Sequence, residues 1–269
     1  MSSKVVVITG GSSGIGRACA LGFAARGYRV VISGRRKDKL DEVVKLADPR
    51  KVGYVMAVEG DVSHPEDCEH LIAETVRVFG GVDVLVNNAG ISMRALFADL
   101  DLNVLHQLMD TNFWGAVYCT KAAMPYLLER RGSVVGISSI AGKKGLPGRT
   151  GYSASKFALE GFLETLRTEN LKKGLHVLVA CPGFTASEIR QTALSADGKP
   201  QGESPRSESD MMSAEEVASR IITAVEKRKR DLILTTTGKL TVWLNKLFPS
   251  LSDKLVYRHM SKEPGSPFT

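Results

Sequence analysis

Short runs of apolar, mostly β-branched residues alternate along the chain with longer segments whose apolar residues recur at helical spacing. The runs predict seven strands, at 4–9, 29–33, 52–58, 82–86, 133–138, 176–181 and 231–235. The longer segments predict helices, among them 17–26, 65–79, one long helix at 102–129, 152–173 and 214–230. Strands that alternate with helices pair into a mostly parallel sheet. We therefore expect an α/β fold with a doubly wound parallel sheet of about seven strands and helices on both faces.

The length of 269 residues suits one large α/β domain, and we expect a single domain over 1–269. After the last strand comes an amphipathic extension, 236–269, whose apolar residues recur among lysines and arginines: Leu240, Val242, Trp243, Leu244, Leu247, Phe248, Leu251, Leu255 and Val256. This stripe could pack on the body, cap a dimer, or touch a membrane surface through 240–256. We favour packing or dimerisation over membrane contact.

A glycine-rich turn joins the first strand to the first helix. Its residues include Gly10, Ser12, Ser13, Gly14, Ile15 and Gly16. Glycines let the backbone approach a pyrophosphate closely, and the following helix offers amide donors and a positive dipole. A plain tight turn is the alternative, but the strand before it and the helix after it favour a phosphate-binding loop.

The second strand ends in Gly34, Arg35 and Arg36, where a cofactor with a free ribose 2′-hydroxyl usually meets a carboxylate. Guanidinium groups suit a 2′-phosphate instead, so the sequence predicts NADP(H). The nearest acid, Asp38, is expected in the first turn of the next helix. Further ligand contacts are predicted at two other strand ends: Asp61 and Val62, where Asp61 could accept from an adenine amino group, and Asn88, Ala89 and Gly90.

Tyr152 and Lys156 lie one turn apart on a predicted helix and therefore share a face. A nearby positive charge would favour the phenolate and bring the pKa of Tyr152 toward working pH. Ser139 follows the fifth strand, where its hydroxyl could hold a carbonyl oxygen beside the tyrosine. Asn112 falls inside the predicted long helix, which suggests a core hydrogen bond or a functional task.

The composition limits the classes of ligand and partner that we expect for the protein. The net charge of +7 comes without a recognisable nucleic-acid motif, so we interpret it as a solvated basic surface and expect no nucleic acid. Four scattered cysteines predict reduced core thiols, and five histidines without metal spacing predict no metal site. No secretory signal is visible at the first residues, so we expect a cytoplasmic protein, with peripheral membrane attachment as the variant.

Together these motifs, in this order from Lys4 to about Leu234, resemble the short-chain dehydrogenase/reductase family and imply a Rossmann-like fold. By that resemblance, Tyr152 is the general acid, Lys156 lowers its pKa and binds the nicotinamide ribose, Ser139 holds the substrate oxygen, and Asn112 supports a proton relay. Contacts to the nicotinamide end are implied for Pro182, Gly183 and Thr185. The resemblance also implies a substrate lid over 185–212, a stretch rich in Ser, Gly, Pro and charge, for which a surface insert is the alternative. Relatives are commonly dimers or tetramers, which implies a homodimer or homotetramer.

These inferences predict an NADPH-dependent reductase acting on a small-molecule ketone or aldehyde, or on the corresponding alcohol. The apolar extension and long lid favour a lipophilic substrate. One rival is a 3-oxoacyl-thioester reductase, against which the extension argues. The other is an NADPH-binding sensor without turnover, which would not need a proton donor.

Overall fold

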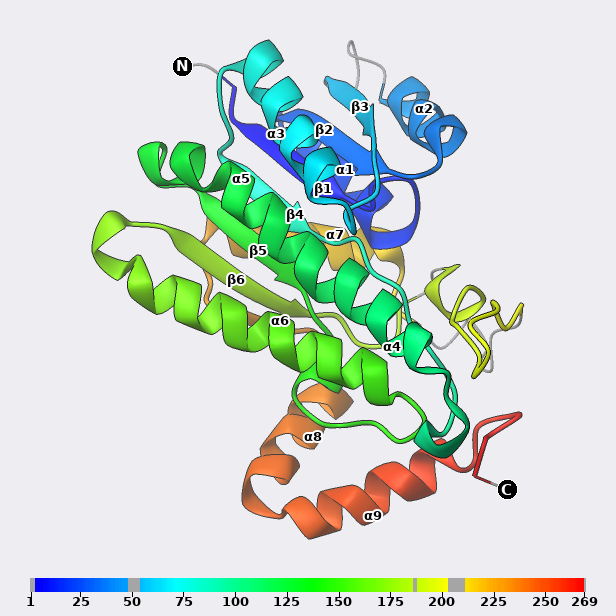
Figure 1. The fold of residues 1–269 in the computed structure, drawn as a ribbon. Helices are drawn as coiled ribbons and strands as arrows, with labels where there is room; N and C mark the ends of the chain where they lie inside the picture. The colour runs from blue at the N-terminus through cyan, green and yellow to red at the C-terminus, as the bar shows by residue number, and fades with distance from the viewer. Residues whose placement is uncertain (1–2, 48–53, 186–187, 203–210, 269) are drawn as a thin grey trace.

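Seven parallel strands form one sheet in this computed structural model, which describes residues 3–47, 54–185, 188–202 and 211–268 (Figure 1). The strands are β1 (Val5–Thr9), β2 (Arg29–Gly34), β3 (Val55–Glu59), β4 (Val84–Asn87), β5 (Ser133–Ile137), β6 (His176–Cys181) and β7 (Asp231–Ile233). Their order is β3-β2-β1-β4-β5-β6-β7, and each neighbouring pair is parallel. The predicted doubly wound α/β sheet is confirmed.

Helices cover both faces of the sheet (Figure 1). One face carries α1 (Gly14–Ala24), α2 (Lys37–Leu46) and α7 (Ala214–Glu226); the other carries α3 (Pro65–Phe79), α5 (Gly115–Glu129) and α6 (Thr150–Glu169). Alternate residues of a strand point to opposite faces. Accordingly, Val6 and Ile8 of β1 belong to the first core, whereas Val7 belongs to the second. One apolar core therefore packs on each face of the sheet.

The strand order reverses direction at β1, which lies between β2 and β4. In sheets of this kind, ligands bind in the crevice outside the carboxyl ends of the strands at such a reversal. Most of the predicted site residues lie in the segments that directly follow the carboxyl ends of β1 to β6, so the topology brings distant parts of the sequence to one edge.

The region predicted as one helix over 102–129 contains an interruption. It consists of α4 (Leu102–Met109), a π-helical turn (Asp110–Trp114) and α5. A π turn is wider than an α turn and is often found at functional sites. Helix-forming residues run without a break through this turn, so the sequence pattern predicts a single helix.

Several element ends differ from prediction by a few residues. The last helix before β7 ends at Glu226 rather than at 230, and Arg228 beyond it has a left-handed backbone with φ +48°. Strand β7 ends at Ile233, because Thr235 caps the next helix by accepting from the amide of Gly238. Helix α6 ends at Glu169, and short 3₁₀ turns occur at 97–99, 140–142, 171–173 and 188–190. Residues 52–53 of the predicted third strand lie outside the described residues.

The C-terminal extension forms a helical hairpin, α8 (Thr236–Leu247) and α9 (Pro249–Met260), below the loop that follows β5 (Figure 1). Its inner face holds that loop: Asn245 donates to the carbonyl of Lys143 at 3.3 Å, and Asp253 pairs with Lys144. The outer face leaves large apolar side chains about half exposed: Leu240, Trp243, Leu247, Phe248, Leu251, Leu255 and Tyr257. Packing on the body thus accounts for only part of the stripe. None of the helices within the described ranges has both the length and the apolar character needed to span a bilayer.

Candidate active site

Tyr152, Ser139 and Lys156 come together at the carboxyl edge of the sheet. Tyr152 lies in the first turn of α6, and the Lys156 ammonium nitrogen is 5.7 Å from the centroid of its ring. Ser139 follows β5 and caps the 3₁₀ turn at 140–142, where its Oγ accepts from the amide of Ala141 at 3.2 Å. The Ser139 hydroxyl lies close enough to the phenol of Tyr152 to lower its pKa. The two hydroxyls and the ammonium therefore lie where one carbonyl oxygen could meet both hydroxyls.

Burial shapes the protonation of this group. It raises the pKa of Tyr152 above its usual 10.0, and the hydrogen bond to Ser139 and the charge of Arg149 only partly oppose this effect. The direction is opposite to the lowering expected from Lys156. Burial also lowers the pKa of Lys156 from 10.5 to about 8, against smaller raising effects of Cys181 and Glu160. At neutral pH the phenol is thus protonated, as a proton donor must be, beside a lysine that can release its own proton.

The ammonium of Lys156 is held by the backbone. It donates to the carbonyl oxygen of Ile137, at the end of β5, at 2.9 Å. Gly90 leaves it room: a Cβ there would lie 3.4 Å from the lysine nitrogen and 3.0 Å from Oδ1 of Asn112. Gly90 therefore fits a position between two predicted catalytic side chains.

Asn112 sits in the π turn and is almost fully buried. Its Oδ1 accepts from the amide of Ile91 at 2.8 Å, and its Nδ2 donates to the carbonyl of Ile91 at 3.0 Å and to Ser155 Oγ at 2.9 Å. The side chain thus ties the segment after β4 to α6. The wide turn directs this amide toward the site.

A buried carboxylate beside the site was not predicted from the sequence. Glu160 lies one turn beyond Lys156 on α6; its Oε1 accepts from Ser138 at 2.6 Å, and its Oε2 lies 2.6 Å from the ammonium of Lys143. Its spacing of four residues from Lys156 was a signal, because it places a third ionisable group on the same helix face. Arg149, whose guanidinium donates to Ser92 Oγ and the Met93 carbonyl, carried no such signal.

The glycine loop has the backbone that a dinucleotide requires. Gly10 and Gly14 adopt positive φ, and a Cβ at Gly16 would lie 2.1 Å from the carbonyl oxygen of Gly10. Asn88 braces the loop, since its Nδ2 donates to the carbonyls of Thr9 and Gly10 at 2.9 and 3.0 Å. No side chain caps α1 at Ser13, which leaves its first amides for a ligand. Ser12 and Ile15 belong to the same turn, and Ala89 donates its amide to Thr9 Oγ1. These residues fit the diphosphate of a nicotinamide dinucleotide.

The ends of β2 and β3 lie beside the glycine loop, where an adenosine contact is predicted. Gly34 faces Ser12 of the loop: a Cβ there would lie 3.6 Å from Ser12 Oγ. The two arginines that follow are exposed and meet carboxylates: Arg35 lies 3.8 Å from Asp61, and Arg36 lies 3.1 Å from Glu188. Asp38 lies in the first turn of α2, as expected.

The segments that follow β3 and β6 complete this edge. Asp61 accepts from the amide and hydroxyl of Ser63, and Val62 is buried. After β6, Pro182 and Thr185 are buried, and a Cβ at Gly183 would lie 2.4 Å from Thr235 Cγ2. The segments that follow β1 to β6 therefore bring the predicted site residues to the carboxyl edge of the sheet.

Part of the predicted lid is described. Residues 188–202 run beside the segment after β4: Leu194 accepts from the amide of Arg94 and donates its own amide to Ser92, both at 2.8 Å. Leu194 joins an apolar cluster with Met93, Val104 and Leu108, against which Tyr152 packs. Residues 186–187 and 203–210 of the predicted lid lie outside the described residues. The described portion therefore contributes Leu194 to the apolar cluster against which Tyr152 packs.

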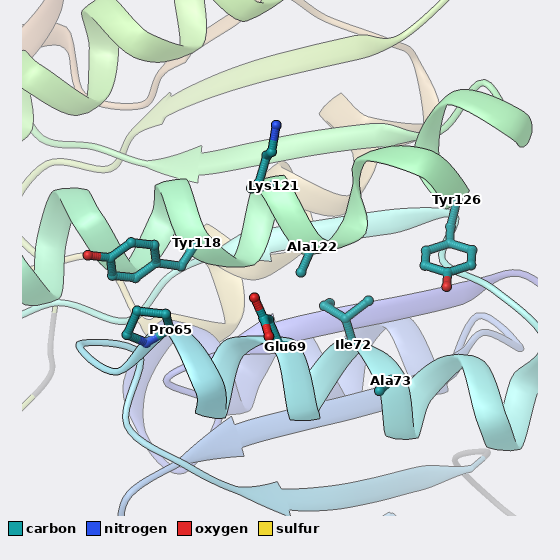
Figure 2. A pocket seen from close by; sticks show the side chains of 8 residues that line it. All are labelled: Pro65, Glu69, Ile72, Ala73, Tyr118, Lys121, Ala122 and Tyr126. Carbon is teal, nitrogen blue, oxygen red and sulfur yellow. The ribbon is translucent and has the colours of Figure 1, made fainter.

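A separate surface groove lies between α3 and α5 (Figure 2). It is lined by Pro65, Glu69, Ile72, Ala73, Tyr118, Lys121, Ala122 and Tyr126. None of these residues was predicted for catalysis or cofactor binding, so the groove is distinct from the candidate site. Within the described ranges, His, Cys, Asp and Glu do not cluster as a metal ion would require, and all four cysteines are buried free thiols.

Comparison with known proteins agrees with this geometry. Residues 4–198 match the family described as short chain dehydrogenase. The chain is 36% identical to mouse dehydrogenase/reductase SDR family member 7B, over 98% of this chain and 83% of that protein. It is 42% identical to 11-beta-hydroxysteroid dehydrogenase 1A of Arabidopsis thaliana, over 70% of this chain and 54% of that protein.

Two solved structures share the fold. A short chain dehydrogenase/reductase from Burkholderia phymatum, in complex with NAD, has a TM-score of 0.82 and 25% identity, covering 93% of this chain and 95% of that one. The alcohol dehydrogenase of Thermococcus sibiricus, complexed with 5-hydroxy-NADP, has a TM-score of 0.75 and 26% identity, covering 87% and 96%. With its parallel sheet, glycine loop and Ser139, Tyr152 and Lys156 at one edge, the chain belongs to the short-chain dehydrogenase/reductase family of oxidoreductases.

Proposed function

We propose that the protein is an NADP(H)-dependent carbonyl reductase that converts a lipophilic ketone or aldehyde to its alcohol, or runs the reverse oxidation. The convergence of Ser139, Tyr152 and Lys156 carries this proposal. A sensor that only bound the cofactor would gain nothing from a partly buried phenol beside a serine hydroxyl. The C-terminal hairpin sets the chain apart from a plain 3-oxoacyl-thioester reductase.

The side chains divide the reaction between them. Ser139 donates a hydrogen bond to the substrate oxygen and stabilises its developing negative charge. Tyr152 gives its phenolic proton to the same oxygen. Lys156 favours the resulting phenolate, and Asn112 supports the relay that returns a proton. When bound, the nicotinamide supplies the hydride to the carbonyl carbon.

The cofactor would lie along the carboxyl edge of the sheet. Gly10, Ser12, Ser13, Gly14, Ile15 and Gly16 would hold the diphosphate, while Asp61, Val62, Asn88, Ala89 and Gly90 would line the adenosine and ribose path. Pro182, Gly183 and Thr185 would meet the nicotinamide end. Arg35 and Arg36, after Gly34, support NADP(H) over NAD(H), because exposed guanidinium groups at this position suit a 2′-phosphate.

The substrate class follows from what surrounds Tyr152. The phenol packs against an apolar cluster to which the described lid contributes Leu194. An apolar wall beside the proton donor supports a bulky lipophilic substrate. The Arabidopsis relative, which is named for a hydroxysteroid, supports the same class.

Exposed apolar side chains support self-assembly. Trp114 and Phe157 are 42% and 46% exposed, and the outer face of the α8–α9 hairpin is similarly open. We infer a homodimer or homotetramer in the cytoplasm. Peripheral membrane attachment through 240–256 is the competing role for the hairpin face, supported by its surrounding lysines and arginines.

Cofactor oxidation tests the reductase. NADPH and NADH would be offered in parallel with 3-oxoacyl thioesters, steroid ketones, long-chain ketones and small aldehydes. Turnover of a bulky lipophilic carbonyl with NADPH, lost in Tyr152→Phe, is the expected result. Tight NADPH binding without turnover on any carbonyl would favour the sensor, and preference for the thioesters would favour the rival reductase.

A further inference from the structure

An ion pair joins the adenosine end of the crevice to the lid. The Nη2 atom of Arg36 lies 3.1 Å from Oε2 of Glu188, and the two side chains are 49% and 53% exposed. Arg36 directly precedes α2, whereas Glu188 opens the 3₁₀ turn at 188–190, after β6. A carboxylate of the lid therefore binds the guanidinium that we propose for the 2′-phosphate.

The other end of the described lid is anchored differently. Leu194 exchanges two backbone hydrogen bonds with the segment 92–94, and the amide of Asp101 donates to the carbonyl of Ala196 at 2.9 Å. These contacts are uncharged and lie beside an apolar cluster. An exposed ion pair is the weaker anchor, because water and salt screen it. The ion pair is thus a replaceable contact of this segment, whose Leu194 end is held by backbone hydrogen bonds. Near Glu188, the buried Arg190 also donates to the carbonyl of Thr185 at 3.0 Å.

Building on the proposed NADP(H) preference, we propose that Glu188 is a cofactor-specificity residue that occupies the 2′-phosphate's position on Arg36. Carboxylate and phosphate both accept from a guanidinium fork, and two anions on one fork repel each other. NADP(H) must therefore displace Glu188, whereas NAD(H), with a neutral 2′-hydroxyl, leaves the pair intact. Glu188 weakens NADP(H) binding and narrows the discrimination between the two cofactors.

The displacement has a structural consequence. The amide and hydroxyl of Thr192 both donate to the carbonyl of Glu188, at 3.0 and 3.1 Å. Release of the Glu188 carboxylate would leave these two hydrogen bonds in place but remove the salt bridge that ties the turn to Arg36, so the turn would open more often while the Leu194 end stays attached. Binding of a 2′-phosphate would thus alter the lid through the side chain of Glu188.

Fragment binding tests the proposal without any substrate. Calorimetry would measure 2′,5′-ADP and 5′-AMP on the full chain, comparing wild type, Glu188→Gln and Glu42→Gln. Glu42 is a matched control, because it is 56% exposed and pairs with Lys39 rather than Arg36. Glu188→Gln should bind 2′,5′-ADP about three- to tenfold more tightly, with 5′-AMP and the control unchanged, and high salt should shrink the gain.

The outcomes separate this proposal from the cofactor preference. Unchanged or weaker 2′,5′-ADP binding by Glu188→Gln, with wild type still preferring that fragment to 5′-AMP, would overturn the role of Glu188 alone. A preference that appears only in Glu188→Gln would support Glu188 and overturn NADP(H) selection by the wild type. No preference in either protein would overturn both.

Hydrogen exchange provides a second reading. NADP⁺ should speed exchange of the Thr192 amide relative to NAD⁺ at equal saturation. Slower exchange with NADP⁺ would overturn the displacement.

Discussion

The ammonium nitrogen of Lys143 lies 2.6 Å from Oε2 of Glu160, which links the loop after Ser139 to the helix that carries Tyr152. The other oxygen of this carboxylate accepts from Ser138, the neighbour of Ser139, at 2.6 Å. Glu160 is only 9% exposed. One buried carboxylate therefore binds the chain on both sides of Ser139, the serine that we propose for catalysis, and fixes it against α6.

Replacing this carboxylate should loosen the site. Glu160→Gln keeps the volume and an acceptor for Ser138 but leaves Lys143 without its counter-charge. We expect the free energy of unfolding to fall by about 1–3 kcal/mol and turnover to fall with it, measured by urea unfolding and by the reductase assay. Adding Lys143→Met should recover part of the stability, since no unpaired charge remains. A free energy of unfolding of Glu160→Gln equal to that of the wild type would contradict the structural role of Glu160.

The two hydroxyls at the reacting centre should differ in importance. Tyr152→Phe removes the proton donor, so turnover should fall by roughly 10²–10⁴-fold while NADPH binding is retained. Ser139→Ala removes one donor to the substrate oxygen and should cost roughly 10²–10³-fold. Steady-state kinetics and cofactor fluorescence measure both quantities. Near-normal turnover of Tyr152→Phe would remove the tyrosine from the mechanism.

The buried charge of Lys156 should make stability depend on pH. Its pKa is about 8 in the folded protein against 10.5 for an ordinary lysine, so burial disfavours the charged form. Below pH 8 both states are protonated and the full cost, about 3 kcal/mol, is present; it is relieved as pH rises toward 10.5. The free energy of unfolding of Lys156→Met should therefore exceed that of the wild type by the largest margin below pH 8. Loss of the hydrogen bond to the Ile137 carbonyl reduces this margin. Denaturant unfolding across this range checks it, and a pH-independent difference would refute it.

The same titration should appear in catalysis. Because the charged lysine favours the phenolate, carbonyl reduction should slow as pH rises through about 8. A pH profile of turnover measures this limb. A rate that is flat to well above pH 9 would indicate that Lys156 keeps its proton in the working enzyme.

The arginine at the end of β2 should set the cofactor preference. Arg36→Gln removes a charged donor to the 2′-phosphate, so NADPH should bind about ten- to a hundredfold more weakly while NADH is unaffected. Lys39→Gln, in the helix that Arg36 precedes, is the control for lost positive charge. Equal weakening of both cofactors by Arg36→Gln would point to damage of the fold rather than to phosphate recognition.

The outer face of the α8–α9 hairpin should mediate assembly. Exchanging Trp243, Leu247 and Leu251 for serine removes apolar area that a second copy would cover, and light scattering should show a smaller particle. Phe97→Ser, at another exposed apolar residue, is the control. Co-flotation of the wild type with anionic vesicles, lost in the triple variant, would assign the face to a membrane instead.

Sequence patterns located the strands because buried parallel strands are continuous apolar runs, and motif order located the glycine loop and the Tyr152–Lys156 pair. Patterns could not reveal contacts between side chains far apart in the chain. Glu188 approaches Arg36 only because the sheet brings the β2 and β6 ends to one edge. The division of the extension into two helices could have been predicted, since Pro249 suits the first turn of a new helix.

The π turn at 110–114 also sets the rotation of α4 relative to α5. Successive residues of an α-helix are rotated by about 100°, so the extra residue of a wide turn offsets α4 from α5 by that angle. Val104 and Leu108 can then face the apolar cluster beside Tyr152 while Cys119 and Ala123 face the sheet. Deleting a single residue within the turn would restore a regular helix and rotate one of these faces out of register. The extra residue therefore sets how the apolar cluster beside Tyr152 is oriented relative to the core that packs on the sheet.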